Sequence, residues 1–162
     1  MKRIPLTQGE FAIVSDSDFD WLSKYKWTYS ESRYSTGVAF RSIKINGRWL
    51  HAYMHRMIMD AKPGEEVDHI NHNRLDNRRE NLRICTHAQN NWNKRKTASN
   101  STGYIGINKW NNRWRAKIKI ESKYLHLGYF DTKEEAAKAY DRAAFFYRGE
   151  YAVLNFTQEL PT

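Results

Sequence analysis

The stretch Val67-Asp68-His69-Ile70-Asn71-His72 decides how this sequence is interpreted, because it places an acid next to a histidine. Asn81 follows His69 by twelve positions, and Asn90 follows Asn81 by nine. Acid and amide oxygens are ligands that suit a hard cation such as Mg²⁺. A histidine has the right unperturbed pKa to take a proton from water near neutral pH. If the fold brings these residues together around one metal ion, they can hydrolyse a phosphodiester bond.

The local pattern around this stretch predicts a strand, a loop, a second strand and a helix. Val67 and Ile70 can anchor the end of the first strand, and residues 71–77 are rich in side chains that form local hydrogen bonds, which favours a turn. Residues 81–85 predict the second strand. Thr86 can then cap a helix, with Gln89 as its capping-box partner.

The residues before this stretch predict a scaffold of strands and short helices. Residues 11–14 form an apolar run typical of a strand, and Asp16 or Ser17 can cap a helix after it. Residues 38–45 and 48–53 predict two strands joined by Asn46-Gly47, a pair that tolerates the positive φ angles of a two-residue hairpin turn. A short helical segment over residues 54–59 follows.

Two histidines of this region stay outside the predicted site. His51 and His55 lie near the end of the hairpin, and we interpret them as structural or solvent-facing rather than as metal ligands.

A change of composition marks the end of the first predicted domain. Residues 94–103 contain no large apolar side chain and begin with three cations, which predicts a flexible linker that follows a DNA backbone through Lys94, Arg95 and Lys96. We therefore expect a first domain over residues 1–93, a linker over 94–101 and a second domain over 102–162.

The second predicted domain is a sheet with one apolar and one cationic face. Strands are expected over residues 104–108, 114–121 and 124–130, and in the middle strand apolar residues alternate with Arg115, Lys117 and Lys119. In the third strand Leu125, Leu127 and Tyr129 alternate with Tyr124, His126 and Gly128. A capping box of Thr132 and Glu135 predicts a helix through Arg148 that ends at Gly149 and packs on the apolar face.

Composition restricts the function classes. The chain has 162 residues, a formal net charge of +9 and a pI near 9.7, a balance that favours a polyanionic partner. With a single cysteine, Cys85, no intrachain disulfide can form, which suggests a reducing cytoplasm. Because no apolar run reaches the roughly 20 residues that span a bilayer, we expect no membrane association.

Three segments resemble the HNH endonucleases of phages and mobile introns: Asp68 to Asn73, Asp76 to Arg83, and Ala88 to Asn91. The resemblance covers about residues 4–94 and implies a ββα-metal (His-Me finger) domain. It further implies that His69 is the general base, that Asn81 orients it, and that Asp68 and Asn90 bind Mg²⁺ or Mn²⁺. Many members have histidine where this chain has Asn90, and His87 is an alternative ligand.

A second resemblance covers about residues 102–156. The segments 103–107, 127–132, 134–137, 139–141 and 154–156 resemble the plant Apetala-two/ethylene-response-factor DNA-binding domain. That family implies a DNA-facing sheet, here formed by Asn108, Lys109, Trp110, Arg113, Arg115, Lys117, Lys119, Tyr124 and His126. Several arginines that read bases in the plant domain are replaced here by Ile105, Asn108 and Tyr124, so the plant target sequence does not carry over.

Together these features predict an α+β chain: a ββα-metal nuclease domain followed by a three-stranded antiparallel sheet packed on one helix. The expected activity is metal-dependent, site-preferring, homing-type cleavage of double-stranded DNA by a monomer, one strand at a time, in the cytoplasm of the host cell if a phage encodes it. Arg79 and Arg83 are expected to contact phosphates. The alternatives are a DNA-binding regulator with a relic nuclease domain and, without motif support, an RNA-binding protein.

Overall fold

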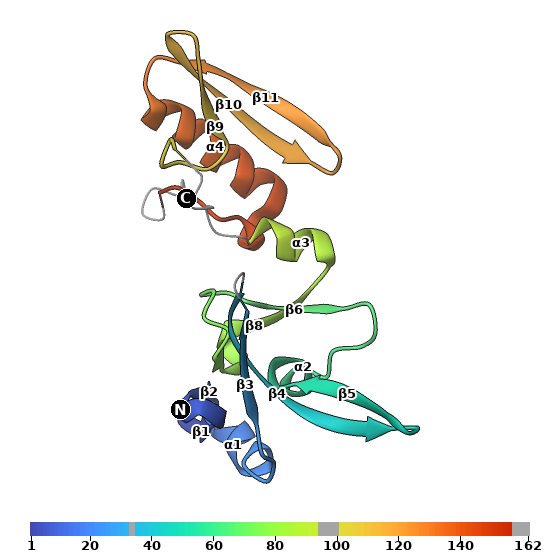
Figure 1. Ribbon diagram of the computed structural model, residues 1–162. Coiled ribbons are helices and arrows are strands. Elements are labelled where there is room, and N and C mark those ends of the chain that lie inside the picture. The colour runs from blue at the N-terminus through green and yellow to red at the C-terminus, as the bar shows by residue number, and fades with distance from the viewer. Residues whose placement is uncertain (33–34, 94–100, 157–162) are drawn as a thin grey trace. The chain divides into compact units, whose positions relative to one another are not determined.

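The computed structural model describes residues 1–32, 35–93 and 101–156 of the chain (Figure 1). The chain divides into two compact units, Met1–His87 and Ala88–Thr162, each with its own hydrophobic core. Most of the expected linker, including Lys94, Arg95 and Lys96, lies outside the described residues, so the domain boundaries given above remain a prediction.

A small sheet opens the first unit. Strand β1 (Lys2–Pro5) pairs antiparallel with β2 (Phe11–Val14) across the 3₁₀ turn η1 (Thr7–Gly9), and β2 pairs in parallel with the two-residue strand β7 (Asp76–Asn77). Helix α1 (Asp16–Leu22) follows β2. Its N-cap residue is Ser15, whereas the sequence predicted Asp16 or Ser17 in that position. The Ser15 hydroxyl does not cap this helix; it accepts a hydrogen bond from the Arg79 backbone N–H at 3.0 Å.

The second sheet of this unit contains the predicted hairpin. Strands β3 (Thr28–Ser32), β4 (Ser35–Ile45) and β5 (Arg48–Tyr53) lie side by side and antiparallel. Asn46 and Gly47 both have positive φ, 49° and 79°, which confirms the expected two-residue turn. Helix α2 (Met54–Ile58) follows β5 directly, as the apolar pattern predicted.

The third sheet carries the acid and the histidine. Strand β6 (Glu66–His69) pairs antiparallel with β8 (Leu82–Cys85), which puts Asp68 opposite Arg83 and His69 opposite Leu82. The 3₁₀ turn η2 (Arg79–Asn81) precedes β8, and α3 (His87–Trp92) follows it. The predicted strand, second strand and helix are present, but the expected loop over residues 71–77 ends in the short strand β7.

One hydrophobic core connects the elements of the first unit. Every sheet contributes to it, through Ile4, Leu6, Ala12, Val14, Leu22, Trp27, Ala39, Met54, Ile58, Val67 and Leu82. The Trp27 indole N–H also donates to the Leu22 carbonyl oxygen at 2.9 Å, so a buried polar group is satisfied. Val67 and Leu82 thereby fix β6 and β8 to the same packed interior that holds α1 and α2.

The second unit has the expected three-stranded antiparallel sheet, in the order β11, β10, β9. Strand β9 (Ile107–Trp110) starts three residues later than predicted, because a turn with positive φ at Gly106 precedes it. Strands β10 (Arg113–Ile120) and β11 (Lys123–Phe130) lie within a residue of their expected bounds.

A bulge in β11 changes which residues share a face. Lys117 pairs with His126 but Ala116 pairs with Gly128, so Leu127 is an extra residue on that strand. The simple alternation expected for residues 124–130 is therefore wrong after Leu127. Tyr129 lies opposite Arg115 on the cationic face, and Leu127 packs into the core.

Helix α4 (Lys133–Arg148) covers the other face of this sheet (Figure 1). Its predicted capping box is present, since the Thr132 hydroxyl and the Glu135 carboxylate each accept a backbone N–H of the other residue. The helix ends at Gly149, which has φ of 55° and lies in the short turn η3 (Gly149–Tyr151). Within the described residues, no helix combines the length and apolar character needed to cross a bilayer.

Candidate active site and nucleic-acid interface

The end of β6 holds the acid and the histidine side by side in a buried position. Asp68 and His69 are each only 6% exposed, and as neighbours on a strand they point to opposite faces. The Oδ2 atom of Asp68 accepts two hydrogen bonds from Arg83, from Nε at 3.0 Å and from Nη2 at 2.8 Å. The Asp68 carboxylate is thus a buried anion with a matched cation.

An amide fixes the tautomer of His69. The Nε2 atom of His69 lies 3.2 Å from Oδ1 of Asn77, the second residue of β7. Because an amide oxygen can only accept a hydrogen bond, Nε2 carries the proton of the neutral ring. This orientation of the Asn77 amide favours the tautomer in which Nδ1 is the basic nitrogen.

The surroundings keep His69 neutral. Burial lowers the pKa of His69 below its usual value, against the opposing effects of the Asn77 hydrogen bond and the Asp68 charge. The ring of His55 lies 5.1 Å from that of His69, centroid to centroid, and burial lowers the pKa of His55 to about 3. Arg74 lowers the pKa of both rings through its positive charge. At neutral pH both imidazoles are uncharged.

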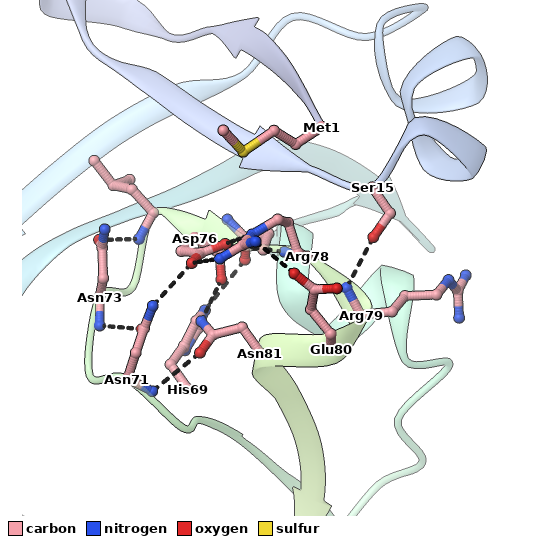
Figure 2. Close-up of polar contacts among 12 residues, drawn as sticks. Met1, Ser15, His69, Asn71, Asn73, Asp76, Arg78, Arg79, Glu80 and Asn81 are labelled. Carbon is pink, nitrogen blue, oxygen red and sulfur yellow. Dashed lines mark hydrogen bonds and ion pairs between the residues drawn. The ribbon is translucent and has the colours of Figure 1, made fainter.

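Asn81 holds the loop between β6 and β7 rather than the imidazole (Figure 2). Its Oδ1 accepts from the Asn71 backbone N–H at 3.0 Å, and its Nδ2 donates to the Asp76 carbonyl oxygen at 2.7 Å. Its own carbonyl accepts from the Ile70 N–H at 2.9 Å. The resemblance assigned the orienting amide to Asn81, whereas the amide that lies against His69 belongs to Asn77.

A charged cluster around Asp76 makes the same loop rigid (Figure 2). The buried Asp76 carboxylate accepts from Arg78, through Nε and Nη2 at 2.8 Å each, and from Asn71 Nδ2 at 2.8 Å. The hydrogen bond from Arg78 is the main reason that the pKa of Asp76 lies below its usual value. Arg78 also pairs with Glu80. The loop that presents Asn77 is therefore held from both ends.

Two polar atoms beside His69 stand out in the described part of the chain. His55 Nδ1 and Asn77 Nδ2 are buried and have no hydrogen-bond partner. Buried polar atoms are usually satisfied, and exceptions gather at functional sites. Sequence reasoning left out both residues, along with Arg74, since nothing in their spacing from His69 indicates proximity.

Both predicted phosphate-contacting arginines are held by carboxylates. Arg79 donates from Nε and Nη2 to the two oxygens of the buried Asp18, at 2.8 Å each, and Arg83 binds Asp68. Their contact with phosphate remains a prediction. Arg79 fastens α1 to the turn before β8, a structural role that the sequence pattern did not show.

The donor chemistry near His69 fits a hard cation. The Asp68 carboxylate, whose Oδ2 atom accepts from Arg83, is a hard oxygen ligand of the kind that Mg²⁺ binds. No cluster of three or more His, Cys, Asp or Glu side chains occurs among the described residues. Asn90 lies on α3 beyond the boundary between the units, so its partnership with Asp68 remains a prediction. The alternative ligand, His87, contacts Glu66, with Nδ1 at 2.6 Å from Oε1.

The cationic face of the second unit gathers most of the predicted DNA-binding residues. The strand register places eight of them on one face, namely Asn108, Trp110, Arg113, Arg115, Lys117, Lys119, Tyr124 and His126. Aromatic rings support the cations: the Arg115 guanidinium lies 4.8 Å from the Trp110 ring centre, and Lys117 Nζ lies 4.6 Å from that of Tyr124. The face thus combines cationic side chains with aromatic rings, and two of the cations, Arg115 and Lys117, lie over rings.

Two residues differ from the expected membership of this face. Lys109 pairs with Trp114 and lies on the opposite face, because successive residues of a strand point to opposite faces and Asn108 and Trp110 flank it. Tyr129 joins the cationic face through the bulge, and its ring lies 4.6 Å from that of His126.

Two family models match separate parts of the chain. The HNH endonuclease model matches residues 52–92, which include α2, β6, β7, β8 and α3. The AP2 domain model matches residues 102–150, which include the three strands of the second unit and α4. The matched segments contain His69 and the cationic face respectively.

Similar proteins divide in the same way. An ethylene-responsive transcription factor of Arabidopsis thaliana is 56% identical over 48 residues, which are 28% of this chain and 11% of that protein. APETALA2-like protein 2 of rice is 52% identical over 46 residues, or 27% of this chain and 11% of that protein. An uncharacterized HNH endonuclease of Acanthamoeba polyphaga mimivirus is 33% identical over 150 residues, 91% of this chain and 76% of the viral protein. The chain belongs to the HNH endonuclease family and carries an AP2 domain after its nuclease domain.

Proposed function

We propose that this protein is a metal-dependent, site-preferring endonuclease that hydrolyses double-stranded DNA, one strand at a time. The observation that carries the proposal is the environment of His69: it is buried beside Asp68, its Nε2 atom lies against the Asn77 amide oxygen, and burial lowers its pKa. A general base must be unprotonated and fixed in position when water attacks. Asp68, adjacent on β6, supplies the hard oxygen that a cation needs.

The residues divide the work of one hydrolysis. His69 Nδ1 takes a proton from the attacking water, while Asn77 holds the opposite nitrogen. Asn81 and Asp76 keep the loop, and with it Asn77, in place. Asp68 and Asn90 would hold Mg²⁺ or Mn²⁺, which when bound stabilises negative charge on the phosphate and the leaving 3′ oxygen. By family resemblance the products carry 5′-phosphate and 3′-hydroxyl ends.

The second unit has a separate task in this proposal. Its face of cations and aromatic rings binds the duplex and gives site preference, because phosphate contacts set the position of a protein on DNA and base contacts specify the sequence. A narrow antiparallel sheet can enter the major groove. Homing of a mobile element is the setting in which such a combination is expected.

A supercoiled-plasmid assay tests the nuclease proposal. The wild type is incubated with Mg²⁺, Mn²⁺ or EDTA, beside His69→Ala, and DNA binding of both proteins is measured by gel shift. We expect metal-dependent conversion to open circles by the wild type and none by the variant, with binding retained in both. Cleavage by His69→Ala at the wild-type rate would contradict the mechanism.

The same assay separates the rival function. A chain that shifts duplex DNA but cuts neither plasmid nor genomic DNA in any metal would be a DNA-binding regulator with an inactive nuclease domain. Genomic DNA is included so that a rare target site is not mistaken for a lack of activity.

A further inference from the structure

The β4–β5 hairpin extends from the first unit, away from its core (Figure 1). Its register sorts the side chains onto two faces, because residues directly opposite one another share a face. Phe40 and Tyr53, Ser42 and His51, and Lys44 and Trp49 are opposite pairs on one of them, here called the aromatic face. The other face carries Arg41 and Ala52, Ile43 and Leu50, and Ile45 and Arg48.

The aromatic face exposes a large ring to solvent. Trp49 is 70% exposed, and the Lys44 ammonium lies 5.9 Å from the centre of its ring. Residues 35–53 contain three cations, Arg41, Lys44 and Arg48, and no acid. An exposed tryptophan beside a cation, on a segment without negative charge, suits a polyanion better than a neutral or acidic partner.

A row of ring contacts connects this face to the candidate active site. The centroid of His51 lies 6.5 Å from that of Tyr53, Tyr53 lies 5.7 Å from His55, and His55 lies 5.1 Å from His69. All four residues belong to the first unit. One ring, that of His55, thus lies between His69 and Tyr53 at the base of the aromatic face.

The dimensions of the hairpin match a groove of duplex DNA. The major groove is about 12 Å wide and admits a two-stranded ribbon. From Tyr53 to Trp49 the strand extends about 13 Å at ~3.3 Å per residue. That length corresponds to about four base pairs at ~3.4 Å each.

We propose that the aromatic face of the β4–β5 hairpin is a second DNA-contacting surface, and that it binds the duplex on one side of the phosphate cut at His69. Lys44 contacts the DNA backbone, and Trp49 packs against the sugar-phosphate edge with its indole N–H available as a donor. The location relative to the cut rests on the proposed nuclease function. A second copy of this chain is a poorer occupant, because a symmetric contact would bring Lys44 and its counterpart together.

A binding series in EDTA tests the surface without any cleavage. The full chain and its variants are titrated onto a labelled duplex at several salt concentrations. We expect Lys44→Ser to reduce the salt slope by about one phosphate contact, and Trp49→Ala to weaken binding about tenfold. Arg48→Ser and Leu50→Ala are matched controls on the opposite face, and each should leave affinity and slope closer to wild type than its partner does.

Tethered cleavage tests the location. Cys85 is buried, and burial raises the pKa of its thiol to about 11, so a cysteine introduced by Lys44→Cys is labelled in preference. An iron–EDTA group attached there should cut on one side of a nick site mapped for the wild type, about four to seven base pairs away, since the steps from Tyr53 to His69 add to the length of the strand. The same group attached through Arg48→Cys should cut more weakly.

The outcomes separate this inference from the nuclease proposal. If both Lys44→Ser and Trp49→Ala bind DNA with wild-type affinity and wild-type salt slope, the hairpin is not a DNA-contacting surface, even if the chain cleaves DNA. Reduced binding by both variants in a chain that never cleaves would support the DNA contact and overturn its location beside a cut. A change from dimer to monomer in sedimentation, with DNA binding unchanged, would assign the face to self-association and also overturn the proposal.

Discussion

At the scale of single residues, the site depends on amides that hold other groups. In the proposed mechanism Asn77 selects the basic nitrogen of His69, and Asn81 supports Asn77 through its hydrogen bond to the Asp76 carbonyl. Neither residue is expected to exchange a proton. Their contribution to catalysis is the geometry of one imidazole ring.

Replacing Asn77 by alanine should lower kcat at least about tenfold, because His69 loses the partner that fixes its tautomer. KM should change little, since Asn77 is buried and not exposed to DNA. Steady-state kinetics on a plasmid substrate measure both values. Asn73→Ala is the matched control: it removes an exposed amide of the same loop that bonds only to loop backbone in the described contacts. An equal loss of kcat in both variants would indicate general loop damage instead.

His55 should make the stability of the chain pH-dependent. Its folded-state pKa of about 3 lies below the ordinary 6.5, so between these values the unfolded chain binds more protons than the folded chain. The stabilisation is present above pH 6.5 and is lost as the pH falls toward 3, at up to about 1.4 kcal/mol per pH unit. Urea unfolding at several pH values measures this slope. In His55→Phe the slope over the same range should be smaller, and an unchanged slope would assign the effect to other groups.

The sequence predicted that Asp68 and His69 lie together at the end of a strand, but it did not predict which residue contacts the imidazole. Asn77 reaches His69 because β7 pairs with β2, a strand more than sixty residues earlier in the chain. Local patterns do not show such a pairing. His55, expected to be structural or solvent-facing, is buried, and its contact with His69 depends on the packing of α2 against β6.

At the scale of elements, local signals predicted the hairpin, α2 and α4, since a turn dipeptide, an apolar run and a capping box each act over a few residues. The bulge in β11 was missed, because an alternating sequence gives no sign of an extra residue. The late start of β9 coincides with a tertiary contact that local patterns do not show. Gly106, which has a positive φ, lies against the Tyr140 ring of α4 directly before Ile107.

Two glycines offer a test of this contact. Both Gly103 and Gly106 have positive φ, 77° and 78°. A Cβ atom added at Gly106 would lie 1.9 Å from Tyr140 Cδ2, whereas a Cβ atom added at Gly103 would have no atom within 4 Å. Gly103→Ala should cost about 1 kcal/mol of strain. Gly106→Ala should cost about 2–4 kcal/mol, since overpacking adds to the strain. Calorimetric unfolding of the full chain compares them, and equal losses would show that Tyr140 moves aside freely.

At the scale of the whole molecule, the sequence correctly indicated two modules, both basic, with different chemistry. The sequence does not show how Asn90, in one unit, comes close to Asp68, in the other. The amide is assigned to the metal by family resemblance alone.

Variants of the two modules should affect different kinetic constants. Replacing Arg115, Lys117 and Lys119 together by serine should raise KM and reduce the salt slope of binding by about three contacts, because the cationic face loses phosphate partners. The value of kcat at saturating DNA should remain close to wild type. His69→Ala should do the opposite, abolishing kcat and preserving affinity. A triple variant with normal KM and lowered kcat would contradict the division of labour.

The parallel pairing of β2 with β7 also orders events during synthesis. Ile13 lies opposite Asp76, and Asp18 binds Arg79, so the centre is built from segments about sixty residues apart. Closing so long a loop is a late step in folding. While β8 is still inside the ribosome, the residues around His69 cannot take up the geometry described above. We therefore expect the proposed nuclease activity to be absent from the nascent chain until this unit is complete.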